Sequence, residues 1–321
     1  MKQSVLTFFC MMLGVAVAQQ PGSLFKDPDF QKRFMGSFGF LPEVEPAIDT
    51  ESEEKKAYFL EIKDLLVADN MRGLKAKLQQ DMDPQVSDPA LQFMYANIWF
   101  QEGNNSEAEK WYKSAIKKFP SYLRAHKNLG LVYYQTGATA EAIESLSEAV
   151  RLGDRSAQTM GLLGLCHLGQ EDWLPAETAL RQAMVLEPKK SQWRKALVQA
   201  FFGAERYDAA HGMLTNMLEK KPDDTNLWLM KGRALMELRR SEEATMAFET
   251  LRHMGSAKPE ILEILGAIYM DLEKPNAALS AYQAAAQGST KLKGSSILRT
   301  ANLLFGYQYT DQAKRYMTAL R

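Results

Sequence analysis

The sequence predicts an all-α fold built from repeated pairs of antiparallel helices, and three observations carry this prediction. Small residues return every 34 residues over most of the chain. Within each copy, apolar residues recur at spacings of three and four, which is the periodicity of an amphipathic helix. Each copy has room for two such helices, and a fixed period of this length is typical of an array of stacked units.

The composition excludes several classes of protein. The chain has 321 residues, with 39 Lys and Arg against 39 Asp and Glu, and 46% of its residues are hydrophobic. These values are ordinary for a globular protein, and they exclude a disordered, collagen-like or polytopic membrane chain. Because the net charge is zero and no basic cluster stands out, no nucleic-acid partner is expected.

Residues 1–18 have the pattern of an export signal. Lys2 supplies a positive charge, residues 5–18 are almost entirely apolar, and small residues precede Gln19, so cleavage after Ala18 is expected. A helix over the apolar run is about 21 Å long, short of the roughly 30 Å hydrocarbon core of a bilayer. The sequence therefore predicts an exported protein, periplasmic or secreted, without a stable membrane anchor.

The chain has two cysteines, which we expect to have different fates. Cys10 lies in the middle of the apolar run rather than at its end, so it does not fit a lipoprotein signal and is expected to leave with the leader. Cys166 is then the single thiol of the mature chain, which excludes an internal disulfide. We expect Cys166 to be a small buried apolar residue.

Residues 19–50 form an N-terminal arm that is rich in aromatic residues. Its five phenylalanines are Phe25, Phe30, Phe34, Phe38 and Phe40. Linkers are poor in aromatics, so the arm is expected to pack on the rest of the protein, either on the helices that follow or in a groove of the repeats. Asp27 before Pro28 predicts a short helix over 28–35.

Residues 51–88 are expected to form a degenerate capping helix pair. Apolar residues keep helical spacing over 51–70 and 71–80, but the column of small residues is missing. Because the exposed end of a stack of repeats needs a cover, this pair is expected to pack on the first repeat.

Two columns of small residues organise the array that follows. The first contains Ala108, Ala142, Ala176, Ala210, Ala244, Ala278 and Ala313. The second, twelve residues earlier, contains Ala96, Gly130, Gly164, Val198, Gly232, Gly266 and Ala301. Helices pack about 8–10 Å apart, depending on the side chains where they cross, so we expect both columns to be buried at the crossings of paired helices. Gly103 and Gly137 fall where a first helix has to end and turn.

The far end of the array carries a further apolar stripe, formed by Ala313, Met317 and Leu320. An additional helix would normally bury such a stripe. We expect it to pack inward on the first helix of its own copy, over 297–307, because Ala313 belongs to the small column. The alternative is that the stripe recruits another chain.

The array resembles the tetratricopeptide repeat. Counted from the start of each copy, a small residue stands at position 8, alanine at position 20, an aromatic residue or leucine in most copies at position 24, and proline at position 32 in three copies. The resemblance implies a right-handed α-solenoid. Its seven repeats are 89–122, 123–156, 157–190, 191–224, 225–258, 259–292 and 294–321. Val198 at a small position, and His167 where Tyr133 and Tyr269 stand in other copies, depart from the pattern.

The search for catalytic chemistry finds no candidate. The four histidines fall in four different repeats, and none has the spacing of a metal ligand. Cys166 and His167 are adjacent on a helix, so their side chains point about 100° apart and cannot chelate one ion together. We therefore expect no enzyme activity, no cofactor and no metal site.

In the resembled family a strip on the first helices lines a concave groove, and position 12 belongs to it. Here position 12 is apolar in every copy: Phe100, Tyr134, Leu168, Phe202, Met236, Met270 and Phe305. The strip also contains Phe93, Arg124, Lys127 and Leu131, and acidic residues follow at Glu237, Glu260, Glu263 and Asp271. These residues form the predicted binding site. An equally weighted alternative is that position 12 is structural and touches the next repeat.

The sequence thus favours an exported, non-catalytic scaffold that binds a protein or peptide segment in its concave groove. The alternative is a structural subunit of an envelope or extracellular assembly that acts through self-association. Residues 25–40 of the arm are a candidate occupant of the groove within the chain itself.

Overall fold

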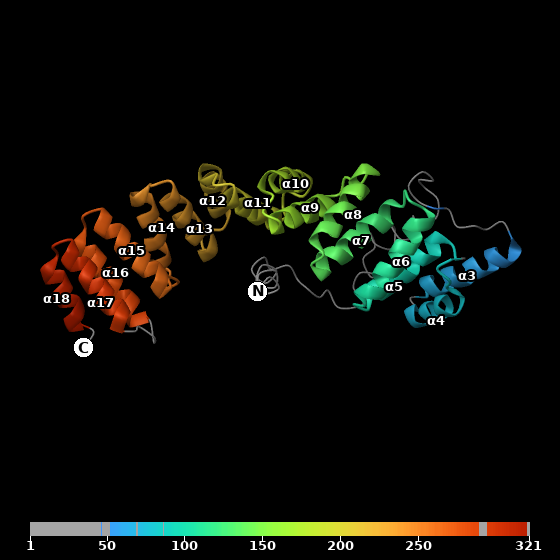
Figure 1. Ribbon diagram of the computed structural model, residues 1–321, viewed down its shortest axis with the longest axis horizontal. Coiled ribbons are helices and arrows are strands. Elements are labelled where there is room, and N and C mark those ends of the chain that lie inside the picture. The colour runs from blue at the N-terminus through green and yellow to red at the C-terminus, as the bar shows by residue number, and fades with distance from the viewer. Residues whose placement is uncertain (1–45, 47–51, 69, 86, 289–293, 320–321) are drawn as a thin grey trace. The chain divides into compact units, whose positions relative to one another are not determined.

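The computed structural model describes residues 46, 52–68, 70–85, 87–288 and 294–319, and every regular element within them is a helix (Figure 1). The expected leader, the arm apart from residue 46, including the expected helix over 28–35, and Leu320 lie outside the described residues. The chain divides into two compact units, Met1–Ala200 and Phe201–Arg321, which are described separately below. None of the described helices is both long enough and apolar enough to cross a membrane.

The first unit contains nine described helices, and the first eight pack in sequence on one another. They are α3 (Glu53–Val67), α4 (Met71–Asp81), α5 (Pro89–Gln101), α6 (Asn105–Lys118), α7 (Leu123–Thr136), α8 (Thr139–Arg151), α9 (Ala157–Gly169), α10 (Trp173–Leu186) and most of α11 (Ser191–Gly203). The pairs α5 with α6, α7 with α8, and α9 with α10 make the closest contacts, and each pair stacks on the next. Ile62, Leu74 and Leu78 of α3 and α4 are fully buried in the same core as α5 to α8.

The second unit repeats this arrangement. Its helices are α12 (Tyr207–Lys220), α13 (Thr225–Glu237), α14 (Ser241–His253), α15 (Pro259–Asp271), α16 (Pro275–Gly288), α17 (Gly294–Gly306) and α18 (Thr310–Ala319). Again α13 packs on α14, α15 on α16 and α17 on α18. The chain is therefore an all-α solenoid of paired helices.

The turn within each pair has the same backbone conformation in all seven copies. Gly103 and Gly137 have φ of 77° and 80°, as their positions after α5 and α7 predict. In the later copies the same position, position 15, has positive φ without glycine, at Glu171, Glu205, Arg239, Glu273 and Gln308. The left-handed residue is therefore a requirement of the short turn, and glycine is only its least strained form.

The small columns are buried where paired helices cross, as predicted. The seven alanines of the first column are all fully buried. In the second column, a Cβ on Gly130 would stand 2.6 Å from Leu146, and one on Gly266 would stand 2.6 Å from Tyr282. Each of these partners occupies position 24 of its own repeat. The side chain at position 24 thus fills the space that the missing Cβ leaves.

The far end of the second unit packs inward, as predicted. Ala313 and Tyr316 of α18 are buried, and Met317 packs against the same cluster. This cluster also contains Ala301 and Leu304 of α17. The described part of the stripe therefore closes on its own helix pair.

Candidate functional site

In the first unit, three apolar residues of the predicted strip keep part of their surface in solvent. Phe100 at the end of α5 and Leu131 and Tyr134 on α7 are half-buried, and each packs on the core of the unit with one side. Side chains held in this way need little further ordering to contact a ligand, which favours them as binding residues.

Two other apolar residues of the strip belong to the core instead. Phe93 is buried between aromatic rings, with centroid distances of 5.7 Å to Tyr112 and 4.9 Å to Tyr122. Leu168 at the end of α9 is also buried. For Leu168, at position 12, the packing agrees with the structural alternative.

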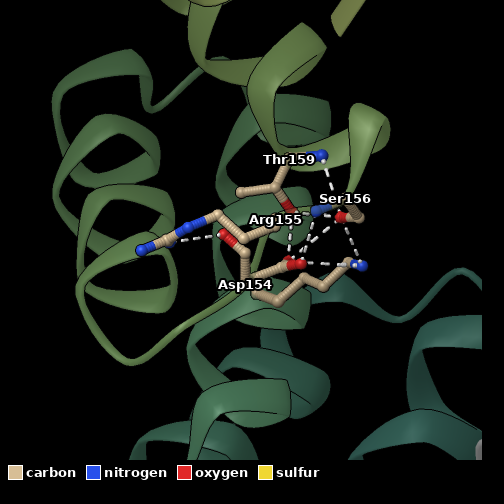
Figure 2. A network of polar contacts seen from close by, with 5 residues as sticks. Asp154, Arg155, Ser156 and Thr159 are labelled. Carbon is tan, nitrogen blue, oxygen red and sulfur yellow. Dashed lines mark hydrogen bonds and ion pairs between the residues drawn. The ribbon is translucent and has the colours of Figure 1, made fainter. Parts of the chain in front are cut away.

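The predicted basic residue Lys127 is engaged by a polar network between α7 and the start of α9 (Figure 2). Its Nζ lies 3.4 Å from Asp154 Oδ2 and donates to Ser156 Oγ at 3.0 Å. Asp154 also accepts from Thr159 Oγ1 at 2.5 Å and from the Ser156 backbone N–H at 2.8 Å. Figure 2 shows these groups converging on the Asp154 carboxylate, where the chain enters α9.

The ionisation of Asp154 follows from this network. Burial by itself would raise the pKa of the carboxyl, but the Lys127 ammonium and the hydrogen bonds from Thr159 and Ser156 more than offset it. The pKa of Asp154 therefore lies below its ordinary value, and the carboxylate is ionised at neutral pH. Lys127 neutralises this buried charge within the second repeat, and the hydrogen bond from Thr159 to the same carboxylate ties the second repeat to the third. Arg124, one turn earlier on α7, is half-buried.

A second polar network joins the first two repeats. The sequence analysis did not predict that its residues interact. Asn97 of α5 is buried, and its Oδ1 accepts from Tyr112 Oη at 2.5 Å and from Asn128 Nδ2 at 2.9 Å. Burial raises the pKa of the Tyr112 hydroxyl, although the bond to Asn128 opposes this shift, so the hydroxyl stays protonated and remains a donor. The available signal was that Asn97 stands at position 9, where Leu131 stands in the next repeat.

In the second unit, position 12 again divides into exposed and buried residues. Met236 on α13 and Phe305 on α17 are each 38% exposed, whereas Met270 on α15 is buried. Phe202 is half-buried and meets the ring of Tyr207 edge-on at 5.8 Å. The predicted binding residues that the second unit leaves accessible are therefore Phe202, Met236 and Phe305.

Acidic groups accompany these apolar residues. Glu237, Glu260 and Asp271 are exposed, and Glu263 is half-buried. The Tyr307 hydroxyl donates to Asp271 Oδ1 at 3.4 Å. Burial, together with the negative charges of Glu263 and Asp271, raises the pKa of Tyr282 to about 12.

Two kinds of reactive site come into question among the described residues, a metal-binding cluster and an exposed thiol. Within the ranges given above, no three His, Cys, Asp or Glu side chains lie close enough to hold a metal ion. Cys166 is buried, as predicted, and burial raises the pKa of its thiol to about 12.

Comparison with known proteins places most of this chain among repeat proteins. Residues 71–254 match the family model described as "Cilia and flagella-associated protein 70 C-terminal domain", and residues 229–291 match the tetratricopeptide repeat model. Among curated proteins, the chain is similar to the BBSome complex member BBS4 of Bos taurus, with 24% identity over 64% of this chain and 46% of that protein. It is similar to anaphase-promoting complex subunit 3 of Schizosaccharomyces pombe, with 21% identity over 58% of this chain and 31% of that protein.

A third relative is the protein O-mannosyl-transferase TMTC1 of Homo sapiens, with 28% identity over 49% of this chain and 18% of that protein. The chain thus spans less than half the length of each of these three relatives. Among solved structures, YrrB, described as a TPR protein with an unusual peptide-binding site, has a TM-score of 0.49 and 18% identity over 52% of this chain and 86% of that one. A tetratricopeptide repeat protein from Parabacteroides merdae has a TM-score of 0.46 and 13% identity over 81% of this chain and 98% of that one.

Proposed function

Because this chain belongs to the family of the cilia and flagella-associated protein 70 C-terminal domain, a family of tetratricopeptide repeats, we propose that it is a scaffold that binds a segment of a partner protein on the concave strip of its first helices. Tetratricopeptide repeats generally act as non-catalytic scaffolds. Two of the relatives are named as members of multi-protein complexes, which supports a role in protein interaction for this chain as well.

One observation carries the proposal of the concave strip as the site. Met236 and Phe305 stand at position 12 with 38% of their surface exposed, although their equivalents Leu168 and Met270 are buried. Large apolar side chains left in water are expected to mark interaction surfaces when several lie on equivalent positions. We infer that Phe100, Leu131 and Tyr134 in the first unit, and Phe202, Met236 and Phe305 in the second, contact the partner.

The experiment is a comparison of binding by matched variants. Met236→Asp and Phe305→Asp place a charge on the proposed strip, and Met246→Asp places one on α14, where Met246 is exposed outside the strip. We expect the first two variants to lose the partners that the wild-type protein captures from a native extract, and Met246→Asp to retain them. All three should keep the wild-type circular dichroism and melting transition. If the strip variants stay folded and still bind, the site lies elsewhere.

The same proteins distinguish a scaffold from a self-associating structural subunit. A scaffold is expected to be monomeric without its partner, which light scattering after size-exclusion chromatography measures directly. A molecular mass of the wild-type protein that rises with concentration, together with a monomeric mass for Phe305→Asp, would favour self-association. A wild-type protein whose strip is occupied by its own residues 25–40 would bind partners more tightly after their removal.

We further propose that the protein is exported, on the basis of the apolar run over 5–18 and the small residues before Gln19. Mass spectrometry of the protein from separated cell fractions tests this. Export predicts an N-terminus at Gln19, and a retained Met1 would refute it.

A further inference from the structure

Position 11 of the first helix is a tyrosine in two repeats, and its hydroxyl reaches the repeat before it. The Tyr133 hydroxyl on α7 donates to Glu109 Oε1 of α6 at 3.2 Å. The Tyr269 hydroxyl on α15 donates to Glu249 Oε1 of α14 at 2.8 Å. In both repeats the tyrosine therefore fills the groove between its own helix and the second helix of the preceding repeat.

The third repeat has His167 at this position, and its groove is open. The His167 ring is smaller and turns to its own repeat, with Nδ1 3.4 Å from Asp172 Oδ2. A depression of about 390 Å³ lies between α8, α9 and α10. Its walls include Ser147 and Val150 of α8, Met160, Leu163 and His167 of α9, and Leu174 of α10. Ser147 takes the place that Glu249, the partner of Tyr269, takes in the fifth repeat.

The exposed face of α10 continues this depression. Leu174, Thr178, Gln182 and Val185 follow one another at spacings of four, four and three, so they form one stripe along the helix. Leu174 is 73% and Val185 75% exposed, the highest values among the large apolar side chains of the described residues. At the equivalent positions α8 carries Ala140, Glu144, Glu148 and Arg151. These four positions are therefore mostly charged on α8. On α10 they are uncharged, with the large apolar side chains Leu174 and Val185 at the two ends of the stripe.

We propose that the depression and the α10 stripe together form a second docking site, separate from the concave strip, for an uncharged helical segment of a partner protein that inserts one aromatic side chain beside His167. The aromatic ring is inferred from Tyr133 and Tyr269, which fill the equivalent groove from within. The lack of charge follows from the walls, where His167 faces Asp172 and no other ionisable side chain is present to pair with a buried charge. A helix matches the spacing of the stripe, because apolar anchors on a docked helix recur at the same intervals.

The first experiment tests whether the groove accepts an aromatic ring. The full chain carries ¹³C-methyl methionine, and the probe is p-cresol, the side-chain analogue of tyrosine. We expect a saturable shift of the Met160 methyl resonance, which lies in the wall, and no saturable shift of the exposed Met246 in the second unit. His167→Tyr is the matched control, because it supplies the ring that the second and sixth repeats already have. His167→Tyr should raise the dissociation constant of p-cresol, measured from the Met160 shift, at least about tenfold.

Two results would overturn the proposal at this stage. One is the absence of a saturable shift at Met160, and the other is an undiminished shift in a folded His167→Tyr protein. Should His167→Tyr fail to fold, Leu174→Asp replaces it as the control, since Leu174 is mostly exposed and its substitution leaves the core intact.

The second experiment identifies the occupant. A photo-reactive benzoylphenylalanine replaces the exposed Thr178, and the cross-linked peptide is sequenced by mass spectrometry. We expect the cross-linked peptide to be a helical, uncharged segment of another protein, with an aromatic residue at the cross-link. The cross-link should be lost in Val185→Asp and retained in Met236→Asp. Retention in Met236→Asp separates this site from the concave strip, so either site can fail alone. A cross-link to residues 25–40 of this chain, to a second copy of it, or to a charged segment would overturn the proposal.

Discussion

Gly164 lies so close to Leu180 that a Cβ on Gly164 would stand 2.5 Å from the Leu180 Cγ. This distance is shorter than any that carbon atoms tolerate without a shift of the surrounding structure. The glycine on α9 is therefore what permits α9 and α10 to cross as closely as they do. The same relationship holds between Gly130 and Leu146 in the preceding repeat.

Gly164→Ala is accordingly expected to lower the free energy of unfolding by about 1–3 kcal/mol, because the added methyl overpacks the crossing. Gly169→Ala, at the end of the same helix, is the matched control, since no atom lies within 4 Å of the added Cβ. Urea unfolding of the two variants measures the difference. A Gly164→Ala protein as stable as Gly169→Ala would contradict the crossing geometry.

Asp154→Asn is expected to destabilise the protein by about 1–3 kcal/mol at neutral pH, because it removes the charged partner of Lys127 and of the hydroxyl donors. The effect should depend on pH. Since the folded pKa of Asp154 lies below its ordinary value of 3.8, its stabilisation is complete above that value and is lost as the pH falls through the folded pKa. The difference between wild type and Asp154→Asn should therefore shrink below about pH 4.

Unfolding free energies between pH 7 and pH 3 test this dependence. Glu53→Gln is the control, because the pair of Glu53 with Lys56 at 3.5 Å is exposed and should contribute less than about 0.5 kcal/mol. A constant difference between wild type and Asp154→Asn across this range would show that Asp154 stabilises the fold without its charge.

The Cys166 thiol is expected to be inert in the folded protein. With its pKa raised to about 12 by burial, only about one thiol in ten thousand is ionised at pH 8, and the thiolate is the reactive form. In a Cys10→Ser protein, a disulfide reagent such as DTNB should release less than one equivalent over an hour at pH 8 and a full equivalent after denaturation. Rapid reaction of the native protein would mean that α9 opens readily.

Tyr316→Ala is expected to loosen the end of the second unit. Tyr316 is buried, and its ring centroid lies 6.4 Å from that of Tyr282. Removing the ring should therefore lower local stability by about 3–5 kcal/mol. Because repeats interact with their neighbours only, hydrogen exchange should accelerate in α17 and α18 and stay unchanged in α5 to α8. The exposed Tyr307 provides the control, and Tyr307→Ala should leave exchange in α18 nearly unchanged.

The sequence alone determined the repeat and its packing. Gly130, Gly164 and the alanine column identify the helix crossings, because close approach of two axes requires small residues and the same requirement returns in every copy. The turn could be predicted only in part. Gly103 and Gly137 marked it in two copies, whereas Glu171 and Arg239 adopt the same left-handed conformation without any signal in their side chains.

Only the tertiary structure decided which predicted site residues are accessible. Leu168, Met236, Met270 and Phe305 share position 12 and an apolar side chain, yet two are buried and two are exposed. Exposure depends on side chains contributed by other helices, which periodicity along one helix does not contain. The availability of the Lys127 charge also depended on another part of the chain. Its partner Asp154 lies in the loop before α9 and neutralises the charge that the sequence assigned to the binding strip.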